Sequence, residues 1–149
     1  MADRKPRSGR TVMIGMALII LAGVWGLVRL SSNGSGHISG ATNEERISYI
    51  ESFGWDSAAV PSLVEEVRIP SRFDEAYEQY NALQKEQGFD LRKYRAYYAK
   101  KYTYEIKNFD GADPAVPICA NLLVIDGEIV GADISSSEAN GLVTVLAKK

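Results

Sequence analysis

The feature that most constrains this chain is an uncharged, mostly apolar run at residues 11–28. Built as an α-helix, a run of this length rises about 27 Å, close to the ~30 Å hydrocarbon core of a bilayer. We therefore expect a single-pass transmembrane helix over residues 11–30. The apolar side chains predicted to lie in the membrane are Val12, Ile14, Leu18, Ile19, Ile20, Leu21, Val24, Trp25 and Leu27.

Charge around this run predicts its orientation. Four basic residues and one acidic residue precede it, whereas Arg29 alone separates it from the neutral stretch 31–36. The positive-inside rule then leaves the N-terminus cytoplasmic and the C-terminal domain extracytoplasmic, at the cell membrane. A cleaved secretory signal is the alternative, but signal cores span about 7–15 residues and end at small residues. Cleavage after Ser32 would place Leu30 at the −3 position, so we favour a retained anchor.

The remaining chain divides into a tether and one domain. We expect a basic cytoplasmic tail at 1–10, a flexible Gly/Ser/Asn-rich linker at 31–42 and an extracytoplasmic domain at 43–149. Residues 31–149 carry twelve basic and eighteen acidic residues, a net charge of −6. This charge argues against nucleic acid or anionic lipid headgroups as the main partner. The domain is long enough for one hydrophobic core.

Two helices are predicted in the first half of the domain. Thr42 and Glu45 have the spacing of a capping box, and Gly54 is placed to end that helix. Ser71 is a candidate cap for a second helix, which Gly88 closes. An apolar stripe at helical spacing marks the inner face of the second helix: Phe73, Ala76, Tyr77, Tyr80 and Leu83.

Strands account for the rest of the pattern. Leu63, Val67 and Ile69 share one parity, which predicts a strand over residues 63–69 with these side chains on one face. Residues 97–107 alternate with period two, and the nearly continuous apolar run 118–125 is typical of a central strand. Asp126-Gly127 then predicts a type I′ hairpin into a strand over 128–134, whereas the last ten residues fit helix or strand. The fold class is α+β: a transmembrane helix, then a two-layer domain of about two helices on an antiparallel sheet of about four strands, in the order α-β-α-β-β-β.

Several segments, taken in order, resemble a family of uncharacterised Gram-positive bacterial proteins. They are residues 49–55 (YIESFGW), 69–74 (IPSRFD), 87–91 (QGFDL), 102–105 (YTYE), 120–124 (ANLLV) and 131–134 (GADI). The resemblance covers residues 44–134 and the single N-terminal span. It implies an extracytoplasmic domain of unknown function, and it transfers no catalytic or binding residue.

A tyrosine- and lysine-rich stretch is the first place to look for a ligand or partner surface. Aromatic side chains between basic ones can stack on sugars, peptides or nucleic acid. The alternative, which we prefer, is a strand whose tyrosines pack on a helix while its lysines shield an exposed edge. The candidate surface residues are Tyr97, Tyr98, Lys100, Tyr102 and Tyr104.

Catalytic and metal-binding patterns are weak in this sequence. His37 is the only histidine and falls in the predicted linker, and Cys119 is the only cysteine. We expect Cys119 to be a buried, inert strand residue, and we expect Asn121 to satisfy local backbone if it is buried. No cofactor, metal site or catalytic residue is predicted. Asp110, Asp113 and Asp126 read as turn residues.

The sequence therefore predicts a membrane-anchored protein whose exported domain acts as a binding or interaction module. The N-terminal helix contacts the lipid bilayer, and the sequence does not identify a protein or peptide partner. An envelope-located hydrolase is one alternative. A structural component of an envelope or spore assembly is the other.

Overall fold

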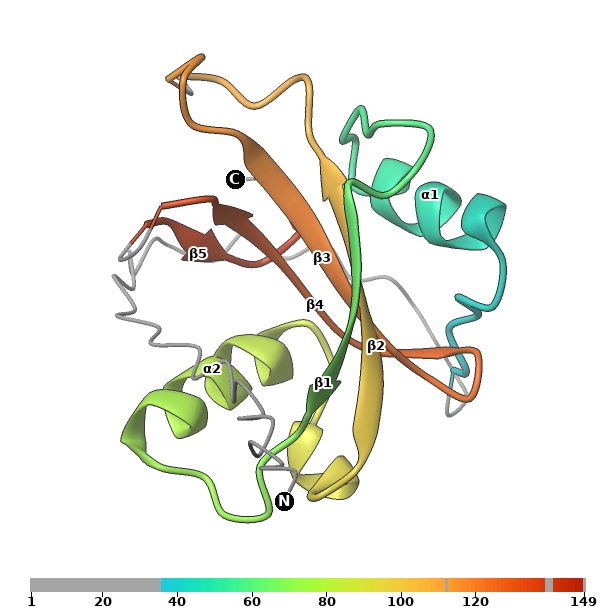
Figure 1. The fold of residues 1–149 in the computed structure, drawn as a ribbon, viewed down its shortest axis with the longest axis vertical. Coiled ribbons are helices and arrows are strands. Elements are labelled where there is room, and N and C mark those ends of the chain that lie inside the picture. The colour runs from blue at the N-terminus through green and yellow to red at the C-terminus, as the bar shows by residue number, and fades with distance from the viewer. Residues whose placement is uncertain (1–35, 112, 139–140, 149) are drawn as a thin grey trace, which may run out of the picture.

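The protein folds into an α+β domain with two α-helices and a five-stranded antiparallel sheet (Figure 1). The computed structural model describes residues 36–111, 113–138 and 141–148. The helices are α1 (Asn43–Glu51) and α2 (Glu75–Glu86), with a short 3-10 helix η1 (Leu91–Tyr94). The strands lie in chain order across the sheet as β1 (Leu63–Arg68), β2 (Tyr98–Glu105), β3 (Ile118–Ile125), β4 (Glu128–Ser136) and β5 (Val143–Thr144). The predicted α+β class and the predicted order of helices and strands are confirmed, and β5 adds a fifth strand.

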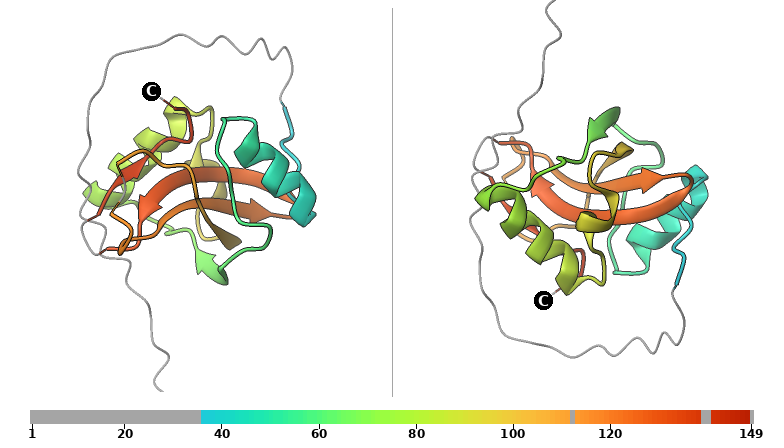
Figure 2. Two further views of the ribbon diagram at one scale, coloured as in Figure 1. Left: turned by 90° about the horizontal axis from the view of Figure 1, so that it is seen from above. Right: turned by 90° about the horizontal axis from the view of Figure 1, so that it is seen from below.

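The two helices cover opposite faces of the sheet, so the domain has three layers and the predicted two-layer packing is wrong. Tyr104 on β2 contacts α1, whereas Asp133 on β4 contacts α2. Thr103 lies opposite Asn121, which lies opposite Asp133, so these three side chains share one face of the sheet. Tyr104 follows Thr103 in β2, so its side chain lies on the other face. Figure 2 shows α1 and α2 to either side of the curved sheet. The reason lies in β3, which is apolar at both parities and therefore needs cover on both faces.

Both helices begin at side-chain caps. The predicted capping box of α1 is present: the Glu45 amide donates to Thr42 Oγ1, and the Thr42 amide donates to the Glu45 carboxylate. In α2 the cap is Asp74 rather than Ser71, because the Asp74 carboxylate accepts from the Tyr77 amide. Pro70 precedes this turn, and α2 begins at Glu75, three residues later than a helix capped by Ser71 would begin.

The β3–β4 hairpin has the predicted type I′ turn. Asp126 and Gly127 both have positive φ, 49° and 78°, which is the backbone conformation that this turn requires. The register shifts between Leu123 and Val124, which leaves Val130 as an extra residue in β4 and marks a bulge close to the turn.

Residues 38–40, assigned by sequence to the linker, pair with this hairpin. The Ile129 amide donates to Ile38 O at 2.8 Å, and the Gly40 amide donates to Gly127 O at 2.9 Å. Gly40 is buried against Ile129, where an added Cβ would lie 2.5 Å from a side-chain carbon. The part of the chain that packs on the sheet therefore begins before residue 43.

The C-terminal residues form the short strand β5 and then return to the core. Leu146 is fully buried, and the Trp55 indole N–H donates to its carbonyl at 2.6 Å.

The strand β1 is more exposed than its apolar pattern predicts. Leu63 is 48% exposed and Val64 is 50% exposed, because β1 lies at the edge of the sheet and neither helix covers it. Ile69, just after β1, is the buried member of the predicted set.

The predicted transmembrane helix and cytoplasmic tail lie outside the described residues. Within the residues that the structure does describe, no helix has the length and apolar character needed to cross a membrane.

Candidate binding surface

The five residues of the predicted ligand surface separate into three environments. Tyr98, Lys100 and Tyr102 alternate along β2 and share the sheet face that α1 covers further along the strand. Tyr104 is fully buried beneath α1, so it cannot contact a ligand. Tyr97 precedes β2 at the opposite parity and its ring lies edge-on to Tyr94, 6.2 Å away.

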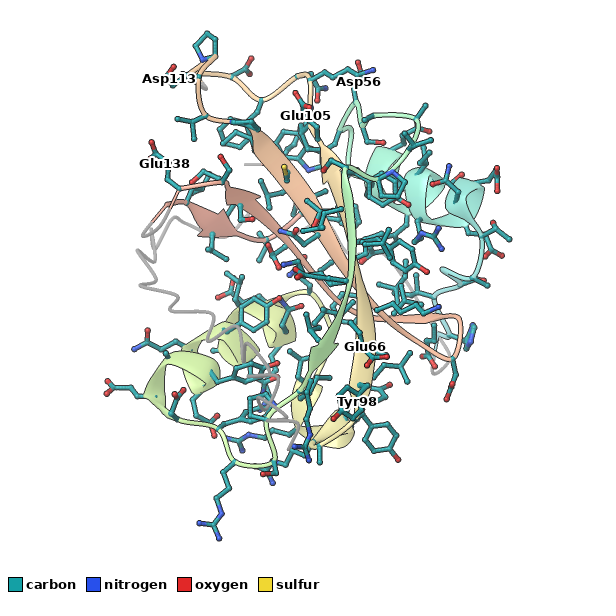
Figure 3. The ribbon with its side chains drawn as sticks, in the orientation of Figure 1. Asp56, Glu66, Tyr98, Glu105, Asp113 and Glu138 are labelled. Carbon is teal, nitrogen blue, oxygen red and sulfur yellow. The ribbon has the colours of Figure 1, made fainter. Side chains whose placement is uncertain are left out.

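The three residues on the shared face line an open groove of about 430 Å³. Its remaining walls come from Glu66 on β1, from residues 40–41 and from the β3–β4 turn at residues 126–127. Tyr98 is 59% exposed and provides an accessible aromatic face. Figure 3 shows Glu66 and Tyr98 near one end of the sheet, with Glu105 near the other.

Arg46 on α1 supports the wall of this groove, and its sequence pattern gave no sign of that role. Its Nε donates to the Tyr104 hydroxyl at 2.8 Å, and its Nη1 donates to Gly40 O at 2.7 Å. Its guanidinium also lies 3.7 Å from the centre of the Tyr102 ring. These contacts fix α1, β2 and the Gly40 segment relative to one another through one 6%-exposed side chain.

Charge on β1 and β2 differs between the two faces of the sheet. On the α2 face Glu65 pairs with Lys101 at 2.7 Å. On the groove face Glu66 lies opposite Lys100 in the register, and within the described residues neither forms an ion pair. The groove therefore offers two acidic groups, Glu66 and Asp126, one basic group and aromatic surface to a ligand.

Comparison with known families gives a match over most of this sheet. The family described as "Domain of unknown function (DUF4830)" matches residues 49–134. The chain belongs to the DUF4830 family. No curated protein and no solved structure matches this chain.

The matched segment of the DUF4830 domain runs from within α1 to Ile134 in β4. It includes Glu66, Tyr98, Lys100 and Tyr102, whereas Arg46 and residues 40–41 precede it. The groove of this chain is thus built partly by the matched domain and partly by the segment before it.

A second polar cluster of the DUF4830 domain lies beneath α2. Asp133 is 5% exposed and accepts from the Tyr80 hydroxyl at 2.7 Å and from Asn121 Nδ2 at 2.8 Å. Asn121 also donates to Ser135 Oγ and accepts from Thr103 Oγ1. Asn121 therefore bonds three side chains on the two neighbouring strands, β2 and β4, rather than the local backbone that the sequence suggested.

Burial dominates the ionisation of this cluster. Desolvation raises the pKa of Asp133, and the hydrogen bonds from Asn121 and Tyr80 oppose that change. Desolvation, with the nearby Asp133 charge, raises the pKa of Tyr80 well above its usual value. Asp133 and Tyr80 do not line the groove, so we interpret the cluster as a link between β2, β3, β4 and α2.

Cys119 and His37 occupy opposite ends of the β3–β4 pair. Cys119 lies opposite Ser135, whereas His37 lies 3.9 Å from Glu128 beside the turn. The seven strand residues from Cys119 to Ile125 span about 20 Å, which separates the two groups beyond any hydrogen bond. Cys119 is half-buried rather than buried, and partial desolvation raises the pKa of its thiol.

His37 borders a second groove of about 420 Å³, together with Phe89, Lys93, Tyr94 and Glu128. Within the residues that the structure describes, no three His, Cys, Asp or Glu side chains are grouped as metal ligands.

Proposed function

We propose that this protein is a bacterial, single-pass membrane protein whose extracytoplasmic DUF4830 domain binds a protein or peptide partner. The observation that carries the proposal is the groove in which Tyr98, Lys100 and Tyr102 lie side by side along β2. Accessible tyrosines are typical of protein interfaces because they bury large area at little conformational cost and still donate a hydrogen bond.

The arrangement of reactive groups supports binding over hydrolysis. A nucleophile needs a general base within hydrogen-bond reach. The single cysteine and the single histidine lie about 20 Å apart along the β3–β4 pair. The groove itself brings together one lysine, two carboxylates and tyrosines, a set suited to recognition of a mixed-charge polypeptide.

Membrane attachment rests on the sequence of residues 1–30. The apolar run at 11–28 and the basic residues before it favour a retained helix with a cytoplasmic N-terminus. The domain then lies outside the cytoplasm, where its partner must also be present.

The groove can be tested by site-specific photo-crosslinking in cells. The photoreactive residue p-benzoylphenylalanine replaces Tyr98 in the full-length protein, and irradiation should yield a discrete adduct. Tyr97 is the matched control, since it is similarly exposed, adjacent in sequence and outside the groove. Lys100→Glu should weaken the Tyr98 adduct. Equal adducts from both positions, or none from Tyr98, would reject the groove as the binding surface.

A further inference from the structure

The outer edge of β1 is open for hydrogen bonding. The strand pairs with β2 on one side only, and no strand of the described residues pairs with its other side. The Ile69 amide donates to Tyr97 O at 2.9 Å. Because hydrogen-bonding direction alternates along an antiparallel strand, the backbone groups of Val67 and Glu65 also point toward β2. The backbone N–H and C=O groups of Val64, Glu66 and Arg68 therefore point away from the sheet.

The opposite side of the sheet is closed by specific contacts. Residues 38–40 bond the first part of β4, and β5 pairs with its last part. Between them, the Ala132 amide donates to Gln84 Oε1 at 2.8 Å, and Gln87 Nε2 donates to Ala132 O at 2.8 Å. Gln84 of α2 and Gln87, which caps its C-terminus, thus occupy backbone groups of β4 that would otherwise be free.

The edge of β1 has only part of the usual protection against strand pairing, namely the charged residues Glu65, Glu66 and Arg68. Natural edge strands carry lysines, prolines or bulges that block a further strand. Residues 63–68 are regularly paired, and their sequence LVEEVR contains neither lysine nor proline. Leu63 and Val64 present exposed apolar side chains on the two faces of the strand.

We propose that an extended segment of a partner protein adds to β1 as an antiparallel strand, with a basic residue opposite Glu66. This inference rests on the proposed binding function and names the class of partner. Strand addition supplies backbone hydrogen bonds, and the alternating side chains supply specificity. Glu65 is already neutralised by Lys101, so Glu66 is the β1 carboxylate left to attract a basic partner residue.

Charge argues against a second copy of this chain as the occupant. Two copies of β1 can pair antiparallel only in registers that bring the outward backbone groups of both strands together. In the two such registers with the greatest overlap, the two-fold axis passes through Glu65 or Glu66. The register centred on Glu66 places that carboxylate directly opposite its own copy, and like charges at that position are destabilising. In the register centred on Glu65 the repulsion is weaker, because each Glu65 is paired with Lys101. A partner with alternating apolar and basic residues avoids this repulsion and matches Val64 and Glu66.

The test uses the full-length protein in detergent micelles and the probe peptide acetyl-Thr-Val-Lys-Thr-Val-Thr-amide. Antiparallel to β1, its lysine lies opposite Glu66 and its second valine opposite Val64. Amide hydrogen exchange at single-residue resolution should slow at least tenfold at Val64, Glu66 and Arg68 when peptide saturates. Exchange at Glu65 and Val67 should not change, because those amides already bond β2.

Two controls separate strand addition from general adhesion. The same peptide with N-methyl groups on its first threonine, its lysine and its second valine loses the three donors that face β1, so it should give no protection. Glu66→Lys should weaken binding of the lysine peptide at least tenfold, and a peptide with glutamate in place of lysine should restore it.

Three results would overturn the proposal: unprotected β1 amides, equal binding of the N-methylated peptide, or protection without peptide in a protein that is dimeric by analytical ultracentrifugation. A Tyr98 photo-adduct with unprotected β1 amides rejects strand addition alone. Loss of both signals rejects the binding function as well.

Discussion

At the scale of single residues, the buried Asp133 carboxylate connects three strands and a helix. Its two oxygens accept from Tyr80 on α2 and from Asn121 on β3, and Asn121 passes the contact on to Thr103 on β2. Each of these polar side chains has a hydrogen-bond partner, which is the condition for keeping polar atoms inside a core. A slip of one residue between β3 and β4 would break these hydrogen bonds, so they favour the observed register.

Asp133→Asn tests the cost of this buried charge. Since the folded pKa of Asp133 is raised, the stability it contributes is fully present below the unfolded pKa of about 3.9 and is lost as pH rises through the folded pKa. The free energy of unfolding of the asparagine variant should therefore rise relative to that of the wild type by up to about 1.4 kcal/mol per pH unit across that window. Urea unfolding of both proteins from pH 4 to 8 measures the difference.

Asp90→Asn is the control with the opposite sign. The Asn81 hydrogen bond lowers the pKa of Asp90, so its contribution is present above the unfolded pKa and is lost as pH falls through the folded one. If the difference in free energy of unfolding between the wild type and Asp133→Asn were independent of pH, the Asp133 carboxylate would not be desolvated as described.

The thiol of Cys119 gives a second residue-scale prediction. Partial burial and the nearby Glu105 and Asp133 charges raise its pKa, so less thiolate is present at neutral pH. Native protein should react with DTNB severalfold more slowly than urea-denatured protein, and the native rate should still be rising above pH 9. Equal native and denatured rates at pH 7 would show that the sulfur is freely accessible.

At the scale of elements, patterns of short range predicted well and packing between elements did not. The capping box of α1 and the Asp126-Gly127 turn depend on residues within four positions of one another, and both are present. The cap of α2 was misplaced because Ser71 and Asp74 both fit the preference, and only the backbone distinguishes them. The apolar parity of β1 gave a buried face, yet burial depends on which strand lies at the sheet edge.

The candidate site was predictable only in part for the same reason. Alternation along residues 98–104 placed Tyr98, Lys100, Tyr102 and Tyr104 on one face, which is correct. It could not reveal that α1 covers Tyr104 and leaves Tyr98 exposed, or that Arg46 reaches Tyr104 across 58 residues of chain. The continuous apolar run of β3 did contain the information that both faces are covered.

The β3–β4 turn can be tested through Gly127→Ala. Alanine is strained at φ 78°, and its Cβ would also lie 3.2 Å from the Ala41 Cβ. Gly88→Ala is the matched control, because Gly88 has φ 88° and an added Cβ there meets no atom of the described residues within 4 Å. We expect a loss of about 1–2 kcal/mol at Gly88, the ordinary cost of a left-handed residue, and about 1 kcal/mol more at Gly127.

Thermal or urea unfolding gives both values. A loss at Gly127 no larger than at Gly88 would show that the contact between Ala41 and the turn is not tight.

At the scale of the whole molecule, the chain enters the domain beside the groove. Residues 38–40 pair with the β3–β4 hairpin, and residues 40–41 and 126–127 line the groove. Residues 29–37 can span at most about 30 Å when extended. Under the proposed anchoring, residue 38 and the groove beside it lie near that distance from the membrane, whereas the β1 edge lies on the other side of the sheet.

Protease access in cells tests this placement. With a C-terminal epitope tag, trypsin added to intact protoplasts should remove the tag, because the positive-inside rule leaves the domain outside. Inverted membrane vesicles should protect it, and a cytoplasmic marker protein should stay intact in the protoplasts. The tag should also sediment with membranes and resist extraction by carbonate, since about 27 Å of apolar helix would span the bilayer core. A tagged protein free in the medium, beginning near Asn33, would mean that residues 1–32 act as a cleaved signal. Protection in intact protoplasts would reverse the orientation, and the groove could then meet only cytoplasmic partners.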